Sequence, residues 1–218
     1  EVDLAADLGL TDYAGAEPTV TAGGIDCPAT LSGGVLTVTV ANVPYGAQAI
    51  RFEFADKIYT AEGLFVTKIL ANAEDIAKIT EYAGGRDPET DTYTGYFVLK
   101  NNIDLGAAEI SAPVDTNEWR RDPARGFVGV FDGRGYAIAN GVYTSGGLFG
   151  SVSKDGIVKN LSIVNARLTA ADSNGSGVVA RKVFGRLENI SLSCTLEGGN
   201  FNSIGTVSAV AAGATIKD

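Results

Sequence analysis

The chain has 218 residues, of which 45% are hydrophobic and 20% charged, and its formal net charge is -9. A sequence this apolar can bury one large core or two modest ones, and its 28 glycines indicate a fold with many turns. The acidic balance repels phosphate groups, so we expect neither a nucleic-acid partner nor binding to an anionic membrane surface. The absence of histidine excludes Ser-His-Asp and Cys-His catalysis and histidine-ligated zinc or iron.

The two cysteines, Cys27 and Cys194, fall in what we interpret as different domains. We therefore expect both to be free, small apolar residues, with a disulfide as the alternative. The sequence contains neither a signal peptide nor an apolar run long enough to insert into a membrane, and it begins at Glu1 rather than Met. These features favour a mature or excised segment of a longer exported precursor.

Residues 1–68 are expected to form an all-β domain. Side chains alternate along short segments such as 35–40 and 49–54, the pattern of half-buried strands. Glycine-rich turn signals separate these segments. Short strands at this spacing favour a small antiparallel sandwich, and the pattern resembles the immunoglobulin-like modules of bacterial surface proteins.

A single amphipathic helix is expected over residues 72–83. Asn72 can cap its first turn, where Glu74 and Asp75 place carboxylates that the helix dipole favours. Its apolar residues recur every third position and form one stripe. Because a bare solenoid end exposes apolar side chains and unpaired strands, we expect this helix to cap the repeat array that follows.

From residue 97 onward, short apolar segments are punctuated by Gly, Asn or Asp, and one pattern recurs. The segment 147–165 has two degraded copies downstream, and Asn160, Asn189 and Asp218 follow one another at a spacing of 29 residues. Such a period with β-type segments is typical of a β-solenoid, whose coils stack about 4.8 Å apart and bury their apolar residues together. We expect these three side chains to form a structural ladder at one corner, with ligand contact as the alternative.

Three elements in this region resemble a single family. Residues 99–105 resemble the opening of a family of bacterial cell-surface β-helices, and residues 127–140 resemble its F-x-G-x-F-D-G-x-G-x-x-I-x-N element. Residues 147–150, GLFG, match the motif after which GLUG repeats are named. The resemblance covers residues 70–218 and implies a right-handed parallel β-helix of the kind present in adhesins, surface proteins and some secreted peptidases. The chain departs from the family at Asn102, where the opening usually has Asp, and in the decayed GLFG copies.

Together these features predict a mainly β chain, with a β-sandwich over 1–68 and a parallel β-helix with its capping helix over 69–218. The last coil is incomplete, because it breaks off at Asp218 where both earlier copies continue into apolar residues. An open coil leaves side chains wet and strand edges unpaired, at a cost on the order of 3–8 kcal/mol. We therefore expect further sequence of a parent protein, or a subunit stacked end to end, to cover it.

Trp119, Arg120 and Arg121 are the candidate ligand-binding residues. An aromatic face beside forked cationic donors suits a sugar ring or an acidic glycan. The alternative is structural: Trp119 packs under its own loop, and the arginines pair with the neighbouring carboxylates.

Enzymatic chemistry would depend on loop carboxylates, and glycosidases need two of them about 5–10 Å apart. The candidates are Asp115, Glu118, Asp122 and Asp132. The segment 132–135 is either a structural turn or part of a calcium loop, and calcium needs six to eight oxygens. Since no Asp-Asp pair lies on a predicted strand, we expect no catalytic residue. Since the segment 132–135 supplies one carboxylate, we expect no cofactor beyond adventitious calcium.

We interpret the chain as a non-catalytic extracellular module of a bacterial surface protein. It would act as an adhesin-like, stalk or ligand-presenting domain, with a glycan or a surface protein as its partner. Two alternatives remain: a fragment of a polysaccharide-active β-helix enzyme, and a structural subunit that stacks end to end.

Overall fold

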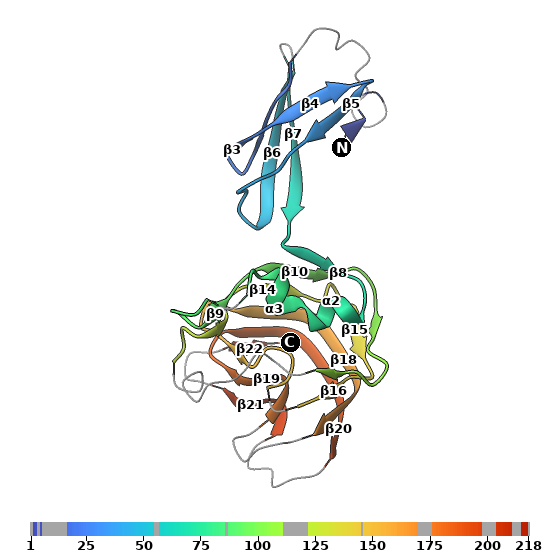
Figure 1. The fold of residues 1–218 in the computed structure, drawn as a ribbon, viewed down its shortest axis with the longest axis vertical. Helices are drawn as coiled ribbons and strands as arrows, with labels where there is room; N and C mark the ends of the chain where they lie inside the picture. Colours follow the sequence, from blue (N-terminus) through green and yellow to red (C-terminus); the bar gives the residue numbers. More distant parts are fainter. Residues whose placement is uncertain are drawn as a thin grey trace. The chain divides into compact units, whose positions relative to one another are not determined.

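The computed structural model describes residues 2–3, 5, 17–54, 57–85, 87–110, 122–144, 146–169, 176–197, 204–210 and 215–217. The chain divides into two compact units, Glu1–Phe65 and Val66–Asp218 (Figure 1). Both are built mainly from β-strands, as the sequence predicts. No helix in the described ranges is long and apolar enough to cross a bilayer.

The first unit consists of two antiparallel sheets that share a small core. One sheet contains β1 (Val2–Asp3), β5 (Val35–Val38) and β4 (Ala29–Ser32), in that order. The other contains β3 (Ile25–Cys27), β2 (Thr19–Ala22), β6 (Gly46–Phe54) and β7 (Lys57–Phe65). The core side chains come from both sheets and include Val20, Leu36 and Phe52. The more specific immunoglobulin-like classification stays a prediction.

Two glycine pairs make the tight hairpins of this unit. Gly23 and Gly24 join β2 to β3, and Gly33 and Gly34 join β4 to β5. All four have positive φ, between 57° and 83°. Two consecutive left-handed residues form the turn whose twist matches that of paired strands, and glycine adopts this conformation without a Cβ clash.

The second unit is a β-solenoid of about four turns, which confirms the predicted solenoid. Its first column of parallel strands is β8 (Lys68–Leu70), β10 (Tyr96–Leu99), β14 (Val130–Asp132), β18 (Ile157–Thr169), β20 (Arg186–Glu197) and β22 (Thr215–Lys217). Two shorter pairs, β11 (Ile103–Asp104) with β15 (Ala137–Ala139) and β12 (Glu109–Ile110) with β16 (Val142–Tyr143), adjoin the same sheet. The opposing column is β9 (Thr92–Tyr93), β13 (Gly126–Phe127), β17 (Ser151–Val152), β19 (Ser176–Val183) and β21 (Ile204–Val210).

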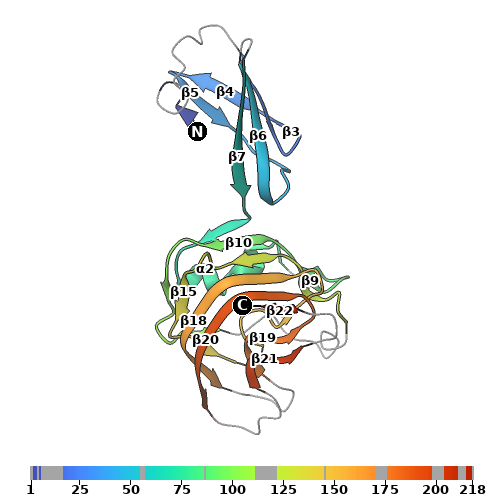
Figure 2. The ribbon, with the colours of Figure 1, turned by 180° about the vertical axis from the view of Figure 1, so that it is seen from behind.

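Short strands of the early coils merge into single long strands in the later ones. Strand β18 pairs in turn with β14, β15 and β16, which are separate segments of the coil before it. Figure 2 shows β18 and β20 as two long neighbouring arcs. Between them, Ile157 to Ile163 pair with residues 29 positions later, so the repeat period of the sequence is the strand register of the fold.

A stack of aromatic rings fills the centre of the solenoid. Tyr93, Phe127 and Phe149 come from three successive coils, with ring centroids 5.4 Å and 4.8 Å apart. Phe97 and Phe131 extend the stack, and all four phenylalanines are fully buried. Because each coil supplies one layer, the core is continuous across residues that are far apart in the sequence.

The predicted helix over 72–83 is present as two short helices, α2 (Ala73–Ala77) and α3 (Ile79–Tyr82). The interruption is at Lys78, whose N–H is shared between the Glu74 and Asp75 carbonyls and whose φ of -102° and ψ of 12° leave helical geometry. Asn72 caps α2 by accepting a hydrogen bond from the Asp75 N–H at 3.0 Å. Ile76 and Ile79 belong to the solenoid core, so both helices cover it.

A buried carboxylate anchors these helices. Asp75 is 6% exposed, accepts hydrogen bonds from the Ala71 N–H at 2.8 Å and the Tyr82 hydroxyl at 2.9 Å, and lies 3.5 Å from Lys68 Nζ. Burial by itself raises the pKa of Asp75, but these partners outweigh it and hold the pKa below its usual value. The stabilisation is therefore present above about pH 4, where the unfolded carboxyl is ionised, and is lost as the pH falls through the lower folded pKa.

Asp75→Asn is accordingly expected to lower the free energy of unfolding by about 1.5–3 kcal/mol at pH 7, because hydrogen bonds to a charged group are removed. The difference from the unsubstituted chain should shrink below pH 3, where the carboxyl becomes protonated. Urea unfolding at both pH values measures this difference. The exposed residue Glu81, on α3, provides the matched control Glu81→Gln. An equal loss at both pH values would show that the charge of Asp75 contributes nothing.

Candidate functional site

Several residues predicted to form sites lie outside the described part of the chain. These are the candidate binding residues Trp119, Arg120 and Arg121 and the candidate carboxylates Asp115 and Glu118. Their roles stay predictions. The free cysteines, by contrast, are both described: Cys27 is buried in the first unit and Cys194 is partly buried in the second. Burial raises the pKa of the Cys194 thiol.

The two described candidate carboxylates are each engaged in a local turn. Asp122 accepts hydrogen bonds from the Ala124 N–H at 2.9 Å and from Arg125 Nε at 3.1 Å. Asp132 accepts from the Arg134 N–H at 2.8 Å, in the turn that follows β14. No cluster of three or more metal-ligating side chains occurs among the residues that the structure describes.

Asn160 and Asn189 lie at one corner of the solenoid. Asn189 Nδ2 donates to Asn160 Oδ1 at 2.8 Å, and Asn160 Nδ2 donates to Asp132 Oδ1 at 3.0 Å. Both asparagines have a φ of 51°, a left-handed conformation that asparagine tolerates better than most residues. The three side chains form one ladder, which begins at Asp132. Asp218, the third residue of the predicted ladder, lies outside the described residues.

Two substitutions of Asn160 separate the stability that the ladder hydrogen bonds contribute from the strain of the left-handed backbone. Asn160→Gly keeps the positive φ and removes two side-chain hydrogen bonds, so we expect the free energy of unfolding to fall by about 1–2 kcal/mol. Asn160→Ala should cost about 1 kcal/mol more, because alanine is strained in the left-handed region. Thermal unfolding measures both. Asn42 is exposed and has a φ of 60°, and Asn42→Gly is the control. Equal effects at positions 42 and 160 would contradict a stabilising ladder.

A second ladder, which sequence reasoning missed, lies at the neighbouring corner. Asn140 Nδ2 donates to Asp104 Oδ1 at 2.9 Å, and Asn165 Nδ2 donates to Asn140 Oδ1 at 2.7 Å. Its members are 36 and then 25 residues apart, so a search for a fixed period does not find them. A local pattern in the sequence could have found them: each member of the ladder follows an isoleucine by one or two positions, in the segments 103–104, 138–140 and 163–165.

The second ladder ends at a change in strand geometry. Between β18 and β20 the register shifts after Ile163, so that Val164 and Asn165 face Ser193 alone. The Asn165 N–H donates to Ser193 Oγ at 2.8 Å. Strand β20 therefore runs on without the left-handed corner residue that Asn140 and Asn165 supply in the coils before it.

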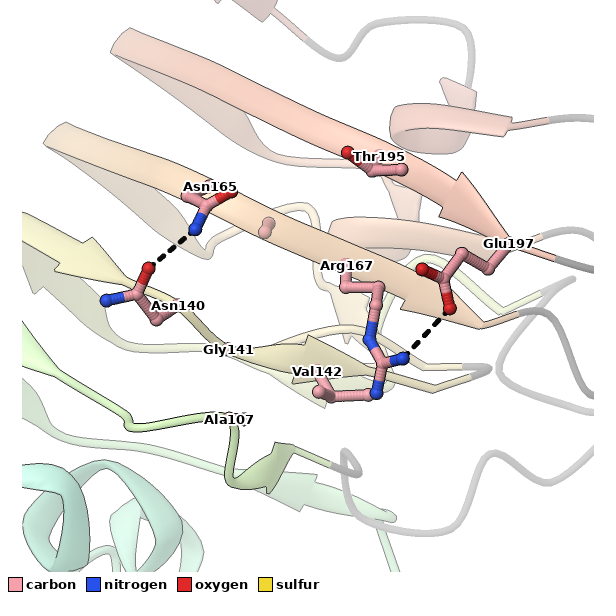
Figure 3. Close-up of a pocket in the computed structure, with 9 residues that line it drawn as sticks. Ala107, Asn140, Gly141, Val142, Asn165, Arg167, Thr195 and Glu197 are labelled. Atoms are coloured by element: carbon pink, nitrogen blue, oxygen red, sulfur yellow. Dashed lines mark hydrogen bonds and ion pairs between the residues drawn. The ribbon is translucent and has the colours of Figure 1, made fainter.

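A cleft of about 290 Å³ opens where this corner is lost (Figure 3). It crosses four successive coils. Its described lining is Ala107, Asn140, Gly141, Val142, Asn165, Ala166, Arg167, Thr195 and Glu197.

Two polar pairs flank the cleft, with small apolar residues between them. Figure 3 shows the Asn140 and Asn165 amides directed toward each other on one side and the Arg167 and Glu197 side chains on the other. The Arg167 Nη1–Glu197 Oε2 distance is 2.9 Å, and both side chains are about half exposed. Gly141, Val142 and Ala166 lie between the pairs and form a buried floor.

The electrostatics of the cleft are balanced. Hydrogen bonds from Asn140 and from the Gly106 N–H hold the pKa of Asp104 below its usual value, so this carboxylate stays ionised behind the asparagine ladder. Arg167 and Glu197 neutralise each other. The cleft thus presents donors and acceptors without a dominant charge, which suits a polar, uncharged ligand.

Comparison of the chain with protein-family models, curated proteins and solved structures gives no match. The fold and the cleft therefore carry the functional argument.

Proposed function

We propose that the chain is a non-catalytic, ligand-presenting module of a bacterial surface protein, exposed outside the cell and adhesin-like in action. In this proposal the second unit is a right-handed parallel β-helix of the GLUG type, and the first is an immunoglobulin-like module. A glycan or a surface protein is the partner. The observation that carries the proposal is the polar cleft, which four hydrogen-bonded coils hold on the side of the solenoid.

Rigid presentation is what the solenoid contributes to this role. Asn140 and Asn165 are held by their ladder, and Arg167 is held by Glu197. Binding groups that are already ordered lose little conformational entropy when a ligand arrives. A stack of coils also supports a site without closing over it, which suits capture of a ligand that belongs to a larger surface.

Binding is favoured over hydrolysis by the placement of the carboxylates. Glu197 is the single carboxylate in the described lining of the cleft, and it is paired with Arg167. Glycoside hydrolysis requires a second carboxyl group across the scissile bond. A fragment of a polysaccharide-active enzyme therefore remains the weaker alternative.

The proposal is tested in two ways. Antibodies against the chain should label intact cells of the source organism, and external protease should remove the label. The immobilised chain should also retain glycan-coated beads without generating new reducing ends. Labelling only after lysis would overturn the surface location. Reducing ends that disappear in Asp122→Asn or Asp132→Asn would support the enzyme instead.

One further observation favours a second candidate, a structural subunit that stacks end to end. Inward-facing residues of β18 such as Leu161 and Leu168 are at most 1% exposed, but Leu196, which pairs with Leu168 in β20, is 49% exposed. The described pairing of β22 with β20 covers only residues 186–188. We propose that further parent sequence or a second subunit covers the part of β20 that includes Leu196.

If the chain stacks end to end, Leu196→Lys should abolish self-association in sedimentation velocity. A chain that is monomeric without the substitution would exclude stacking.

A further inference from the structure

We propose that the cleft between the Asn140–Asn165 pair and the Arg167–Glu197 pair binds a neutral saccharide of one or two sugar rings. The inference deepens the proposed function and rests on it only for the biological setting. The charge, the hydrogen-bonding groups and the shape of the cleft each favour such a ligand.

Charge selects against an acidic ligand. The Arg167 guanidinium is 2.9 Å from Glu197, so a ligand carboxylate bound at Arg167 would lie close to the Glu197 carboxylate and be repelled by it. The ionised Asp104 stands behind Asn140, at 2.9 Å from its amide nitrogen. The chain as a whole carries -9, which also disfavours approach of an anion. A neutral ligand meets none of these penalties.

Hydrogen-bonding groups of both kinds face the cleft, which matches hydroxyl groups. Each sugar hydroxyl donates one hydrogen bond and accepts others, so its site needs acceptors and donors side by side. Glu197 offers its second carboxylate oxygen as an acceptor, and Arg167 offers guanidinium N–H groups beyond the one that binds Glu197. Thr195 lies on β20, two residues before Glu197, and contributes a hydroxyl. Vicinal hydroxyls can thus bridge the Arg167–Glu197 pair.

Shape limits the ligand to one or two rings. About 290 Å³ is near the lower end of the range for small-molecule sites. Gly141, Val142 and Ala166 form the floor between the polar pairs, and all three are buried, so the polar groups at the two sides make most of the contact with a ligand. Gly141 has no room for a larger residue, because a Cβ there would lie 2.7 Å from Leu105 Cδ1 and 2.8 Å from Tyr143 Cε2.

The test is an NMR titration of the full chain, observed through backbone amides. The probes are three neutral disaccharides, lactose, cellobiose and maltose, together with digalacturonic acid as an acidic probe of similar size. At least one neutral disaccharide should shift the amides of residues 165–167 and 195–197 saturably, and digalacturonic acid should bind there more weakly. Shifts confined to other residues, no saturable shift with any neutral probe, or preference for the acid would each overturn the proposal.

Two substitutions and a matched control assign the site. Arg167→Ala should weaken the binding of the neutral disaccharide about tenfold or more, since a charge-assisted hydrogen bond is lost. Glu197→Gln should weaken it too, and should improve binding of digalacturonic acid. Arg186 is an exposed arginine on β20, 3.5 Å from Glu188 and outside the cleft, so Arg186→Ala should bind as the unsubstituted chain does. Equal effects of Arg167→Ala and Arg186→Ala would contradict the assignment.

Failure of this inference can be told apart from failure of the proposed function. If intact cells are labelled but no neutral disaccharide binds, the surface module stands and the cleft is not its saccharide site. If a disaccharide binds at the cleft but labelling requires lysis, the site stands and the surface location falls. Preserved amide dispersion in each variant shows that the fold is intact.

Discussion

Replacing Phe149 by alanine is expected to lower the free energy of unfolding of the solenoid by about 3–5 kcal/mol. The ring is fully buried, stacks on Phe127 with centroids 4.8 Å apart, and meets Phe131 edge-on at 5.3 Å. The cavity could not close easily, because hydrogen bonds between coils hold its walls in place. Tyr93 also donates a hydrogen bond to the Phe149 carbonyl at 2.8 Å, which fixes the backbone beside the lost ring.

Urea unfolding followed by circular dichroism, with amide exchange to locate the affected unit, measures this effect. Tyr136 is an aromatic residue of the same unit that is 36% exposed, and Tyr136→Ala is the control. Tyr136→Ala should lower the free energy of unfolding clearly less than Phe149→Ala, since removing a partly exposed ring leaves little cavity. Phe149→Leu should fall between the two. A Phe149→Ala chain as stable as Tyr136→Ala would show that the aromatic stack does not hold the coils together.

Gly129→Ala is the second substitution with a large expected effect, about 3 kcal/mol. An added Cβ would lie well inside contact distance of the Gly95 carbonyl oxygen and 2.6 Å from the Gly95 nitrogen. These atoms belong to the backbone of the adjacent coil, and the Val130 N–H donates to the same carbonyl at 2.9 Å. Relief of the clash would therefore separate two hydrogen-bonded coils.

Thermal unfolding should show this loss as a fall in Tm of about 6–12 °C. Gly135→Ala is the control that has backbone strain but no clash, because Gly135 has a φ of 82° and nothing lies within 4 Å of an added Cβ. Gly135→Ala should cost only the strain of the left-handed region, about 1–2 kcal/mol. A loss at Gly135 equal to that at Gly129 would contradict a tight approach between coils.

The two ladders show how far a sequence period predicts a fold. The spacing of Asn160 and Asn189 predicts their corner, because the strand register between β18 and β20 keeps the same 29-residue period there. Asn140 and Asn165 were missed, because the coils that join Asp104 to them differ in length while their corners still coincide in space. A ladder requires the same corner position in successive coils, and this does not require equal spacing in the sequence.

The helix over 72–83 shows the same limit on a smaller scale. Its cap at Asn72 and its apolar stripe depend on residues within one or two turns, and both could be predicted. The interruption at Lys78 was not predicted. Nor was the buried cluster in which the Asp75 side chain joins Ala71, Tyr82 and Lys68, because residues outside the two helices take part in it.

The sequence by itself determined the mainly β character, the solenoid and the position of one corner, because alternation, glycine turns and a constant period are local or nearly local signals. Only the tertiary structure decided where a cleft opens. That cleft depends on a one-residue shift between β18 and β20, which brings Asn165 opposite Ser193 and Arg167 beside Glu197. Strand register is set by how whole coils stack, so residues from four coils meet in a site that no segment of the chain encodes alone.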